Sequence, residues 1–299
     1  MNHVKKELGE KIRNYREQKK LSRENFCKDE MNLTVRQLAR IETGESLPTL
    51  PKLIYISRQL VISVADLIGE KHMVLPKKYL DLKNYIIKES TYNKEAEIKI
   101  ESSFDIIYQE FYVYLPEDEQ LTIDICRSIN KVHILENSDF GKSILEDYFV
   151  QIQNKNEYSV NDFLLVNLYF HSIQYSEFEA DKFDIILKKV IEQIEKASEI
   201  ELFLVNKILI TIMGIFIVKE EYEKLIPIIK WCRHVMDKNK DYYKKPIVDM
   251  VEAKYWLHKG NYTKGNLYYK QAIQLAILQG SSVLIDKIEE EYRDDQNRI

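Results

Sequence analysis

The sequence predicts an all-α protein, with a small N-terminal helical domain at residues 1–69, a linker at 70–78 and a long helical array at 79–299. Two observations lead to this fold class. Only 8 Gly and 6 Pro occur in 299 residues, and so few breaks favour long helices over many-turned β structure. Apolar residues also recur at spacings of three and four almost throughout, and a hydrophobic share of 45% is enough for packed cores.

The composition favours a cytoplasmic protein. The three cysteines, Cys27, Cys126 and Cys232, lie far apart, so we expect neither a disulfide framework nor a zinc site. The charged N-terminus lacks the apolar run of a secretory signal. The longest apolar stretch, residues 200–218, reaches the length of a membrane span, but charged residues interrupt it and favour a buried helix. We therefore expect no membrane partner.

The net charge of −4 conceals an asymmetry between the two ends of the chain. Residues 1–70 carry 13 Lys and Arg against 10 Asp and Glu, a net charge of +3. The remaining residues carry 31 and 38, a net charge of −7. A mildly basic domain on an acidic body suits the binding of an anion by the N-terminal domain.

The first seventy residues predict five short helices, and the third is the best defined. The first helix covers about residues 5–18, and Ser22 caps the second. Thr34 and Gln37 have the spacing of a capping box that begins the third helix. Gly44 then supplies the left-handed residue that ends it.

The second and third helices, joined by a short connection, have the arrangement of a helix-turn-helix, whose second helix enters the major groove of DNA. Arg36 and Gln37 lie in the first turn of that helix, and Arg40 lies one turn further on. Arginine can contact guanine O6 and N7 together, and glutamine can contact adenine N6 and N7. Four residues at helix starts suit contacts with phosphates: Thr34, Ser22, Arg23 and Lys52. The alternative is that all these side chains are solvated groups on a small helical domain.

An ordered apolar frame favours the DNA-binding interpretation. Two further helices open near Thr49 and Ser63. With them, about fifty residues resemble the Cro/lambda-repressor type of helix-turn-helix domain. The residues that carry this resemblance are Leu38, Ile41, Glu42, Gly44, Pro48, Leu53, Ile56, Leu60 and Leu67. The chain departs from the common form in about one extra residue before the third helix, and in Phe26 and Cys27, where Leu and Ala are usual.

Residues 79–299 predict an array of paired helices. The clearest unit, residues 253–281, resembles a tetratricopeptide repeat, with the small residues Ala253, Gly265 and Ala272 where two helices approach closely. Earlier units share this form less distinctly, and about five or six repeats fit the length. Such stacks curve and present a concave binding face.

The concave face predicts a binding site for an extended peptide. Asn206 and Asn167 lie inside strongly apolar stretches, and a buried asparagine amide can bond both the N–H and the C=O of a peptide backbone. Each amide can equally be satisfied within the protein. Five further residues are candidates for the walls of the site, although such residues more often belong to the core: Tyr169, His171, Phe203, Ile210 and Met213.

The sequence contains no recognisable catalytic constellation. It lacks the phosphate-binding, dinucleotide-binding, metalloprotease and serine-hydrolase motifs. The six histidines are scattered, and the acidic run at 289–291 fits a solvated helix. We therefore expect no enzyme activity, no metal site and no cofactor.

A helix-turn-helix domain followed by such repeats resembles the Rgg-type branch of the peptide-sensing (RRNPP-type) cytoplasmic regulators of Gram-positive bacteria. Residues 33–60, 115–125 and 161–170 are most similar to the streptococcal regulators of competence within that family. The resemblance implies that a short hydrophobic signalling peptide binds the repeats, and that the bound protein forms a homodimer. It also implies that this dimer binds an inverted repeat in double-stranded DNA and activates competence genes. Asn206 falls where the family keeps a backbone-binding asparagine, and Arg36, Gln37 and Arg40 fall on its recognition helix.

The acidic segment Glu117, Asp118 and Glu119 suggests an autoinhibitory latch. Paired with Glu117 or its neighbours, Arg36 would be unable to contact DNA, and peptide binding would shift the equilibrium toward the open form. The alternative is an ordinary acidic surface turn.

Two other functions fit the same residues. The chain is either a DNA-binding repressor whose repeats serve only dimerisation or protein contacts, or a helical scaffold whose front domain binds protein. A response to short apolar peptides separates the first from a peptide-gated activator. A steep loss of binding with rising salt separates DNA binding from the second.

Overall fold

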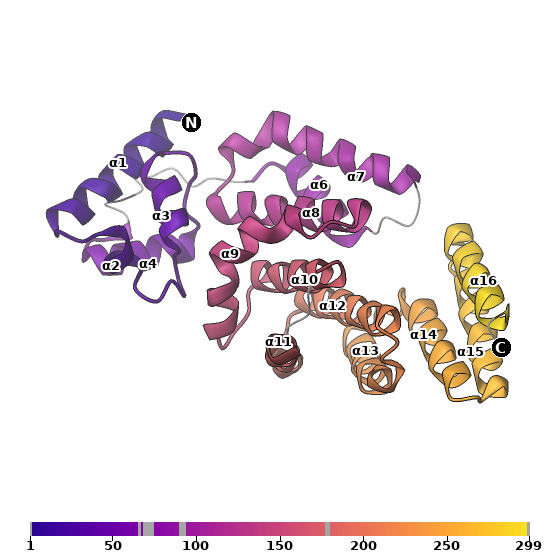
Figure 1. Cartoon of the computed structure of the whole chain (residues 1–299). Helices are drawn as coiled ribbons and strands as arrows, with labels where there is room; N and C mark the ends of the chain where they lie inside the picture. Colours follow the sequence, from indigo (N-terminus) through magenta and orange to yellow (C-terminus); the bar gives the residue numbers. More distant parts are fainter. Residues whose placement is uncertain (1, 65–66, 68–74, 90–93, 177–179, 298–299) are drawn as a thin grey trace. The chain divides into compact units, whose positions relative to one another are not determined.

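The structure of the protein is a computed structural model, and its helices confirm the predicted all-α fold. Within the described residues the only β-type pairing is an isolated bridge between Leu47 and Pro116. The chain divides into two compact units, Met1–Asn156 and Glu157–Ile299 (Figure 1). The structure describes residues 2–64, 67, 75–89, 94–176 and 180–297.

The first unit contains the N-terminal domain, called the head below (residues 1–69), together with the helices that follow it. The head helices are α1 (Asn2–Gln18), α2 (Arg23–Cys27), α3 (Val35–Glu42) and α4 (Leu50–Leu60). They are followed by α6 (Lys77–Lys88), α7 (Lys94–Ile106), α8 (Glu117–Leu135) and α9 (Asp139–Asn154). A π-helical turn, Ile107–Phe111, and a 3-10 turn, Tyr112–Tyr114, connect α7 to α8. The expected linker at 70–78 and the fifth head helix from Ser63 lie largely outside the described residues.

The starts of α2 and α3 and the end of α3 lie where the sequence predicts, whereas α1 begins at Asn2, about three residues before its predicted start. The Ser22 hydroxyl accepts the Asn25 N–H at 3.1 Å, and Thr34 and Gln37 form the expected capping box at the start of α3. Gly44 follows α3 with a φ of +73°, a conformation that residues with a side chain rarely adopt. A Cβ atom at this position would also come within 2.9 Å of Lys6.

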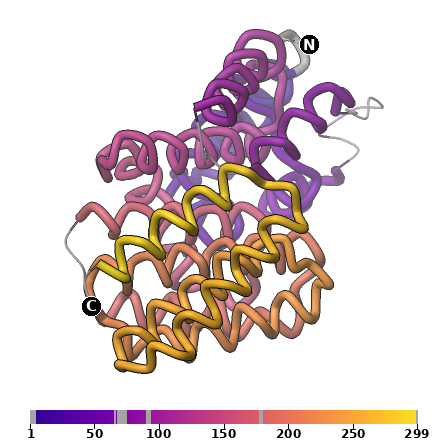
Figure 2. The backbone as a smooth tube through the Cα atoms, turned by 90° about the vertical axis from the view of Figure 1, so that its right-hand side faces the viewer, coloured from indigo at the N-terminus to yellow at the C-terminus, as the bar shows by residue number. Residues whose placement is uncertain are grey.

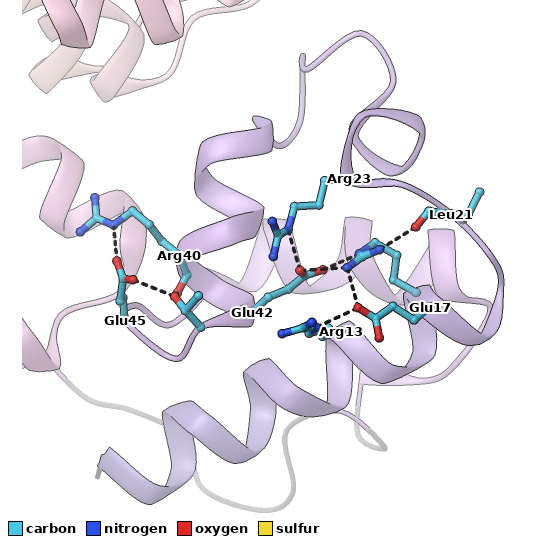
Figure 3. Close-up of polar contacts among 9 residues, drawn as sticks. Arg13, Glu17, Leu21, Arg23, Arg40, Glu42 and Glu45 are labelled. Atoms are coloured by element: carbon cyan, nitrogen blue, oxygen red, sulfur yellow. Dashed lines mark hydrogen bonds and ion pairs between the residues drawn. The ribbon is translucent and has the colours of Figure 1, made fainter.

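The head has a continuous apolar core crossed by one buried ion cluster. Glu42, at the end of α3, accepts a hydrogen bond from Arg16 of α1 at 2.5 Å. It accepts a second from Arg23 of α2 at 2.8 Å (Figure 3). The cluster therefore ties three helices together, and a buried carboxylate with two cationic partners is satisfied. The buried apolar side chains of the head are Leu8, Ile12, Phe26, Cys27, Leu33, Leu38, Ile41, Leu53, Ile56, Leu60 and Leu67.

The second unit is a stack of helices that pack on near neighbours in sequence, and α11 meets α10 and α12 through the ring of Phe183. Figure 2 shows the last three running side by side. The helices are α10 (Val160–Gln174), α11 (Ala180–Gln193), α12 (Glu199–Val218), α13 (Leu225–Asn239), α14 (Lys245–His258), α15 (Tyr262–Leu278) and α16 (Ser282–Asn297).

The small residues of the predicted repeat unit lie where α14 and α15 approach closely. Ala253 and Ala272 are fully buried. A Cβ atom at Gly265 would lie 2.4 Å from the side chain of Leu257 and 3.3 Å from the carbonyl oxygen of Ala253. Only glycine therefore fits this contact between the two helices.

Helix α12 is the apolar stretch whose length matches a membrane span. Of its most apolar 18-residue window, 56% is buried inside the protein. It packs against α10 and α13, as the core helix of a stacked array does. This agrees with the expected buried helix.

Candidate functional site

Two predicted DNA-contacting residues, Thr34 and Gln37, form the cap of α3. The Thr34 hydroxyl accepts the Gln37 N–H at 3.1 Å, and the Gln37 amide oxygen accepts the Thr34 N–H at 3.0 Å. Gln37 is only 3% exposed, so its amide is not presented at the surface. A contact between Gln37 and an adenine would require this side chain to leave the cap.

The two arginines of α3 are bound by residues that follow the head. The Arg36 guanidinium donates to the carboxylate of Asp147 on α9. The Arg40 guanidinium donates to the side-chain oxygen of Gln120 on α8 at 2.7 Å, and Gln120 in turn donates to the Tyr112 carbonyl at 2.7 Å. Both arginines that were expected to contact DNA bases are therefore bonded to other side chains of the first unit.

The start of α4 is held by the first turn of α8. The Lys52 ammonium donates to Glu117 at 2.6 Å and to Asp118 at 2.5 Å. The Thr49 hydroxyl, which does not cap its own helix, donates to the other oxygen of Asp118 at 2.9 Å. A carboxylate therefore lies at the N-terminus of α4, beside a cation and a hydroxyl, where an anion is favoured.

Electrostatics at this contact are those of a desolvated ion cluster. Burial raises the pKa of the Glu117 carboxyl, although Lys52 lies beside it. Burial alone would lower the pKa of Lys52, but the charges of Glu117 and Asp118 outweigh it and raise that pKa. Burial likewise opposes the charge of Asp118, but Lys52 outweighs it and lowers the carboxyl pKa. Lys52 is therefore an ammonium ion shared by two acids.

Further contacts extend this surface, which we call the docking face. The N–H of Glu117 donates to the carbonyl of Leu47 in the head at 2.6 Å. Gln151 of α9 donates to the carbonyl of Glu30, just before α3. The docking face is defined by Arg36, Arg40, Thr49 and Lys52 on the head and by Glu117, Asp118, Gln120, Asp147 and Gln151 on α8 and α9.

The predicted pairing of Arg36 with Glu117 or its neighbours is wrong, because Arg36 has a different partner. Arg36 lies against Asp147, whereas Glu117 and Asp118 bind Lys52. The reason is geometric, because the α8 start meets the α4 start while α9 meets the α3 start. Glu119 also points elsewhere, since it accepts from Tyr79 at 2.5 Å and from Lys83 at 2.7 Å, both on α6.

Of the remaining residues predicted to contact phosphates, Arg23 forms a hydrogen bond within the head. It donates to Glu42 at 2.8 Å (Figure 3). Ser22 is exposed and caps α2.

Sequence reasoning missed Lys5, a buried cation near the docking face. Its side chain is 1% exposed, and its ammonium has no hydrogen-bond partner. The nitrogen lies 5.7 Å from the ring centre of Tyr114, in the connection between α7 and α8. Burial, aided by the charge of Arg40, lowers the pKa of Lys5 to about 8. The residues next to Lys5 in the sequence are mostly polar, so nothing in the local pattern predicts that its side chain is buried.

The predicted peptide-binding residues concentrate on α10 and α12 of the second unit. Asn206 is 4% exposed, and its side-chain oxygen has no hydrogen-bond partner. The Asn167 oxygen lies 3.4 Å from the Thr211 hydroxyl, and this hydroxyl lies 3.3 Å from the Nε2 atom of His171. Helix α12 thus carries a buried, unsatisfied amide at Asn206, and α10 and α12 together form a small polar cluster at Thr211.

One face of α12 is only partly covered. It includes the predicted residues Phe203 and Ile210. We call this surface the α12 face, and its half-buried residues are Phe203, Lys207, Ile210, Thr211, Gly214 and Ile217. The sequence analysis did not select Lys207, Thr211, Gly214 or Ile217. Their helical spacing places them on the same face as Phe203 and Ile210, and this pattern could have predicted them.

Two other predicted peptide contacts belong to the interior. Met213 is fully buried, and Tyr169 is nearly so, with its ring 5.2 Å from that of Phe170. In the part of the chain that the structure describes, no group of three or more His, Cys, Asp or Glu side chains is arranged to hold a metal ion.

Comparison with known proteins gives consistent matches. The family model described as ComR tetratricopeptide matches residues 76–292. The apo form of the competence regulator ComR from Streptococcus vestibularis is 34% identical and has a TM-score of 0.82, covering 98% of this chain and 99% of that one. A comparison with curated proteins finds no match.

Two structures of ComR from S. thermophilus are also similar to this chain. Its apo form is 31% identical, with a TM-score of 0.85, and the match covers 98% of this chain and 100% of that one. Its complex with DNA and the signalling peptide ComS is 31% identical, with a TM-score of 0.69, and covers 97% and 99%.

Proposed function

The chain belongs to the ComR family of competence regulators, and from this premise we propose that a short apolar peptide switches it into a DNA-binding activator. The relative from S. thermophilus was solved with DNA and its signalling peptide. In this proposal the head, 1–69, binds DNA, and residues 79–299 bind the peptide and form a homodimer in the cytoplasm. We assign it no catalytic role and no cofactor.

The docking face is the observation that carries the proposal. Arg36, Arg40 and Lys52 each contact a side chain of α8 or α9. DNA phosphates and base edges need the same guanidinium and ammonium donors. A head held in this way cannot bind DNA with those groups, so the docked and DNA-bound forms exclude one another.

Asp118 supports this interpretation because its carboxylate lies where a phosphate would bind the head. It accepts from Thr49 and Lys52 at the start of α4. Phosphates bind helix starts through hydroxyls and cations of the same kind. Asp118 and a DNA phosphate would therefore compete for the same donors.

The α12 face supports a peptide ligand. The unsatisfied oxygen of Asn206 can accept a backbone N–H of an extended peptide. Leaving such a buried group unpaired costs about 1–3 kcal/mol, which a bound peptide would recover. Phe203 and Ile210 on the same face supply apolar contacts for its side chains. A peptide that prefers the undocked form would shift the equilibrium by that preference.

Dimerisation follows from the expected target. An inverted repeat has twofold symmetry, so two heads of a symmetric dimer can each occupy one half-site. Arg36 and Arg40 would read bases, and Lys52, Thr34, Ser22 and Arg23 would position the head on phosphates.

The test is binding of a fluorescent duplex that carries a candidate inverted repeat, measured with and without a synthetic apolar octapeptide. We expect the wild-type chain to bind only with peptide and to lose affinity steeply as salt rises. The double variant Glu117→Gln, Asp118→Asn should bind without peptide, because it leaves Lys52 without its two acidic partners.

The matched control is Glu110→Gln, which removes the acidic partner of Lys78 at an exposed pair that is not part of the docking face. It should behave as wild type. If the double variant still needs the peptide to bind DNA, the proposed latch is wrong, but the proposed DNA-binding function is not contradicted. The absence of DNA binding in every protein under both conditions would contradict the function itself.

A further inference from the structure

Packing against the described residues does not explain the glycine at position 214, about one turn before the C-terminal end of α12. A Cβ atom added there would meet only the Gln174 amide nitrogen, at an ordinary contact distance of 3.8 Å. Gly9 and Gly265 differ, since a Cβ atom at Gly265 would lie 2.4 Å from Leu257 and one at Gly9 would lie 2.3 Å from a carbonyl oxygen. Gly44, Gly260 and Gly280 have a positive φ that favours glycine. Glycine inside a helix costs about 1 kcal/mol relative to alanine. At Gly214 no neighbour among the described residues accounts for that cost.

Gly214 lies midway across the width of the α12 face, near its C-terminal end. At 100° per residue, Ile210 and Ile217 flank it on one side, and Lys207 and Thr211 flank it on the other. All four flanking residues are half-buried. The missing side chain therefore leaves a notch in an otherwise continuous surface of side chains.

Asn206 provides an independent indication of a ligand on the same helix. Its amide oxygen is buried and has no partner, so the site lacks a hydrogen-bond donor. Eight residues separate Asn206 from Gly214, which corresponds to about 12 Å along a helix. An extended peptide covers that length with about four residues.

We propose that the main chain of the bound peptide lies directly against Gly214, which makes this glycine a determinant of peptide specificity. The inference rests on the proposed function and adds the course of the ligand across α12. Glycine permits the close approach of another backbone, because no Cβ atom keeps it away. The peptide is held by the Asn206 amide at one point and crosses the notch about four residues further along.

The experiment measures the binding of synthetic fluorescein-labelled apolar octapeptides, and the one that binds wild type most tightly is used throughout. Gly214→Ala should weaken its binding by roughly tenfold or more, because the added methyl group occupies the space of the peptide backbone. Gly214→Leu should abolish measurable binding. The thermal unfolding temperature of the peptide-free Gly214→Ala variant should be about 2 °C higher than that of wild type, since alanine is the better helix former.

The control is Lys230→Ala on the exposed surface of α13, which should leave both affinity and unfolding temperature as in wild type. If Gly214→Ala binds the peptide as tightly as wild type does, and binding still depends on Asn206, the peptide backbone does not lie against Gly214. The proposed function would remain intact. Failure of the wild-type chain to bind any octapeptide would overturn peptide recognition, and the notch with it.

Discussion

The docking face and α12 differ in whether their polar groups have hydrogen-bond partners within the chain. On the docking face Lys52 has two acidic partners, Arg36 is bonded to Asp147, and Arg40 is bonded to Gln120. On α12, Asn206 is buried and its side-chain oxygen has no hydrogen-bond partner. One surface is already satisfied by the chain itself, and the other lacks a hydrogen-bond donor.

This difference indicates what each surface requires for a change of state. Opening the docking face exposes ions that are now paired, so a competing ligand must replace every contact. Filling the α12 face removes a penalty that already exists in the peptide-free protein. Substitutions at the two surfaces should therefore change stability in opposite directions.

The largest effect is expected from Glu117→Lys, which places a second cation against Lys52. Breaking a buried pair costs about 3–5 kcal/mol, so DNA binding without peptide should rise by roughly a hundredfold or more. Fluorescence anisotropy of the duplex gives this ratio directly. Glu110→Lys, a charge reversal at the exposed pair with Lys78, should leave peptide dependence unchanged. An unchanged requirement for peptide in Glu117→Lys would show that this contact does not hold the head.

The second effect is expected from Asn206→Leu on the opposite surface. Removing an unsatisfied buried oxygen should raise the free energy of unfolding by about 1 kcal/mol, whereas breaking the docking pair lowers it. Peptide affinity should nevertheless fall by roughly 10–100-fold, because the bond to the peptide backbone is lost. Chemical denaturation and peptide titration of the same sample test both statements. A destabilised variant with normal affinity would mean that Asn206 serves the core.

Local patterns predicted much of the head correctly. The capping box of Thr34 and Gln37, the stop at Gly44 and the apolar frame depend on residues close in sequence. The close contact at Gly265 was likewise readable, because repeat spacing places small residues between paired helices.

Long-range partners were not predictable in this way. Arg36 and Asp147 are 111 residues apart, and no periodicity relates them. Glu119 points to α6 because its direction on α8 depends on how the two helices pack. The role of Gly214 also needed the structure, since the sequence does not show which glycines have room for a side chain.

A third, smaller effect concerns Lys5, the unpaired cation near the docking face. Burying an ammonium without a partner opposes docking, so Lys5→Met should reduce DNA binding without peptide by roughly three- to tenfold. In wild type the penalty is absent above about pH 10.5, grows as pH falls, and is complete below the lowered pKa of about 8.

Raising the pH from 8 to 9.5 should therefore strengthen docking and lower peptide-free DNA binding in wild type more than in Lys5→Met. Duplex titrations of both proteins at the two pH values measure this difference. Parallel curves for the two proteins would exclude Lys5 as the titrating group.

The smallest effect is expected at Asp147, the partner of Arg36. Both side chains are partly exposed, at 48% for Arg36 and 34% for Asp147, and such pairs contribute about 0.2–1 kcal/mol. Asp147→Asn should therefore raise peptide-free DNA binding by no more than about fivefold, and high salt should remove the difference.

Arg36→Ala breaks the same pair but should act in the other direction, since it also deletes a proposed base contact worth about 1–3 kcal/mol. With saturating peptide, Asp147→Asn should bind the duplex as wild type does, whereas Arg36→Ala should bind weakly and tolerate changes in the half-site. Equal losses in the two variants would mean that the pair stabilises the fold and that Arg36 does not read DNA. A rise in both would mean that docking alone sets their behaviour.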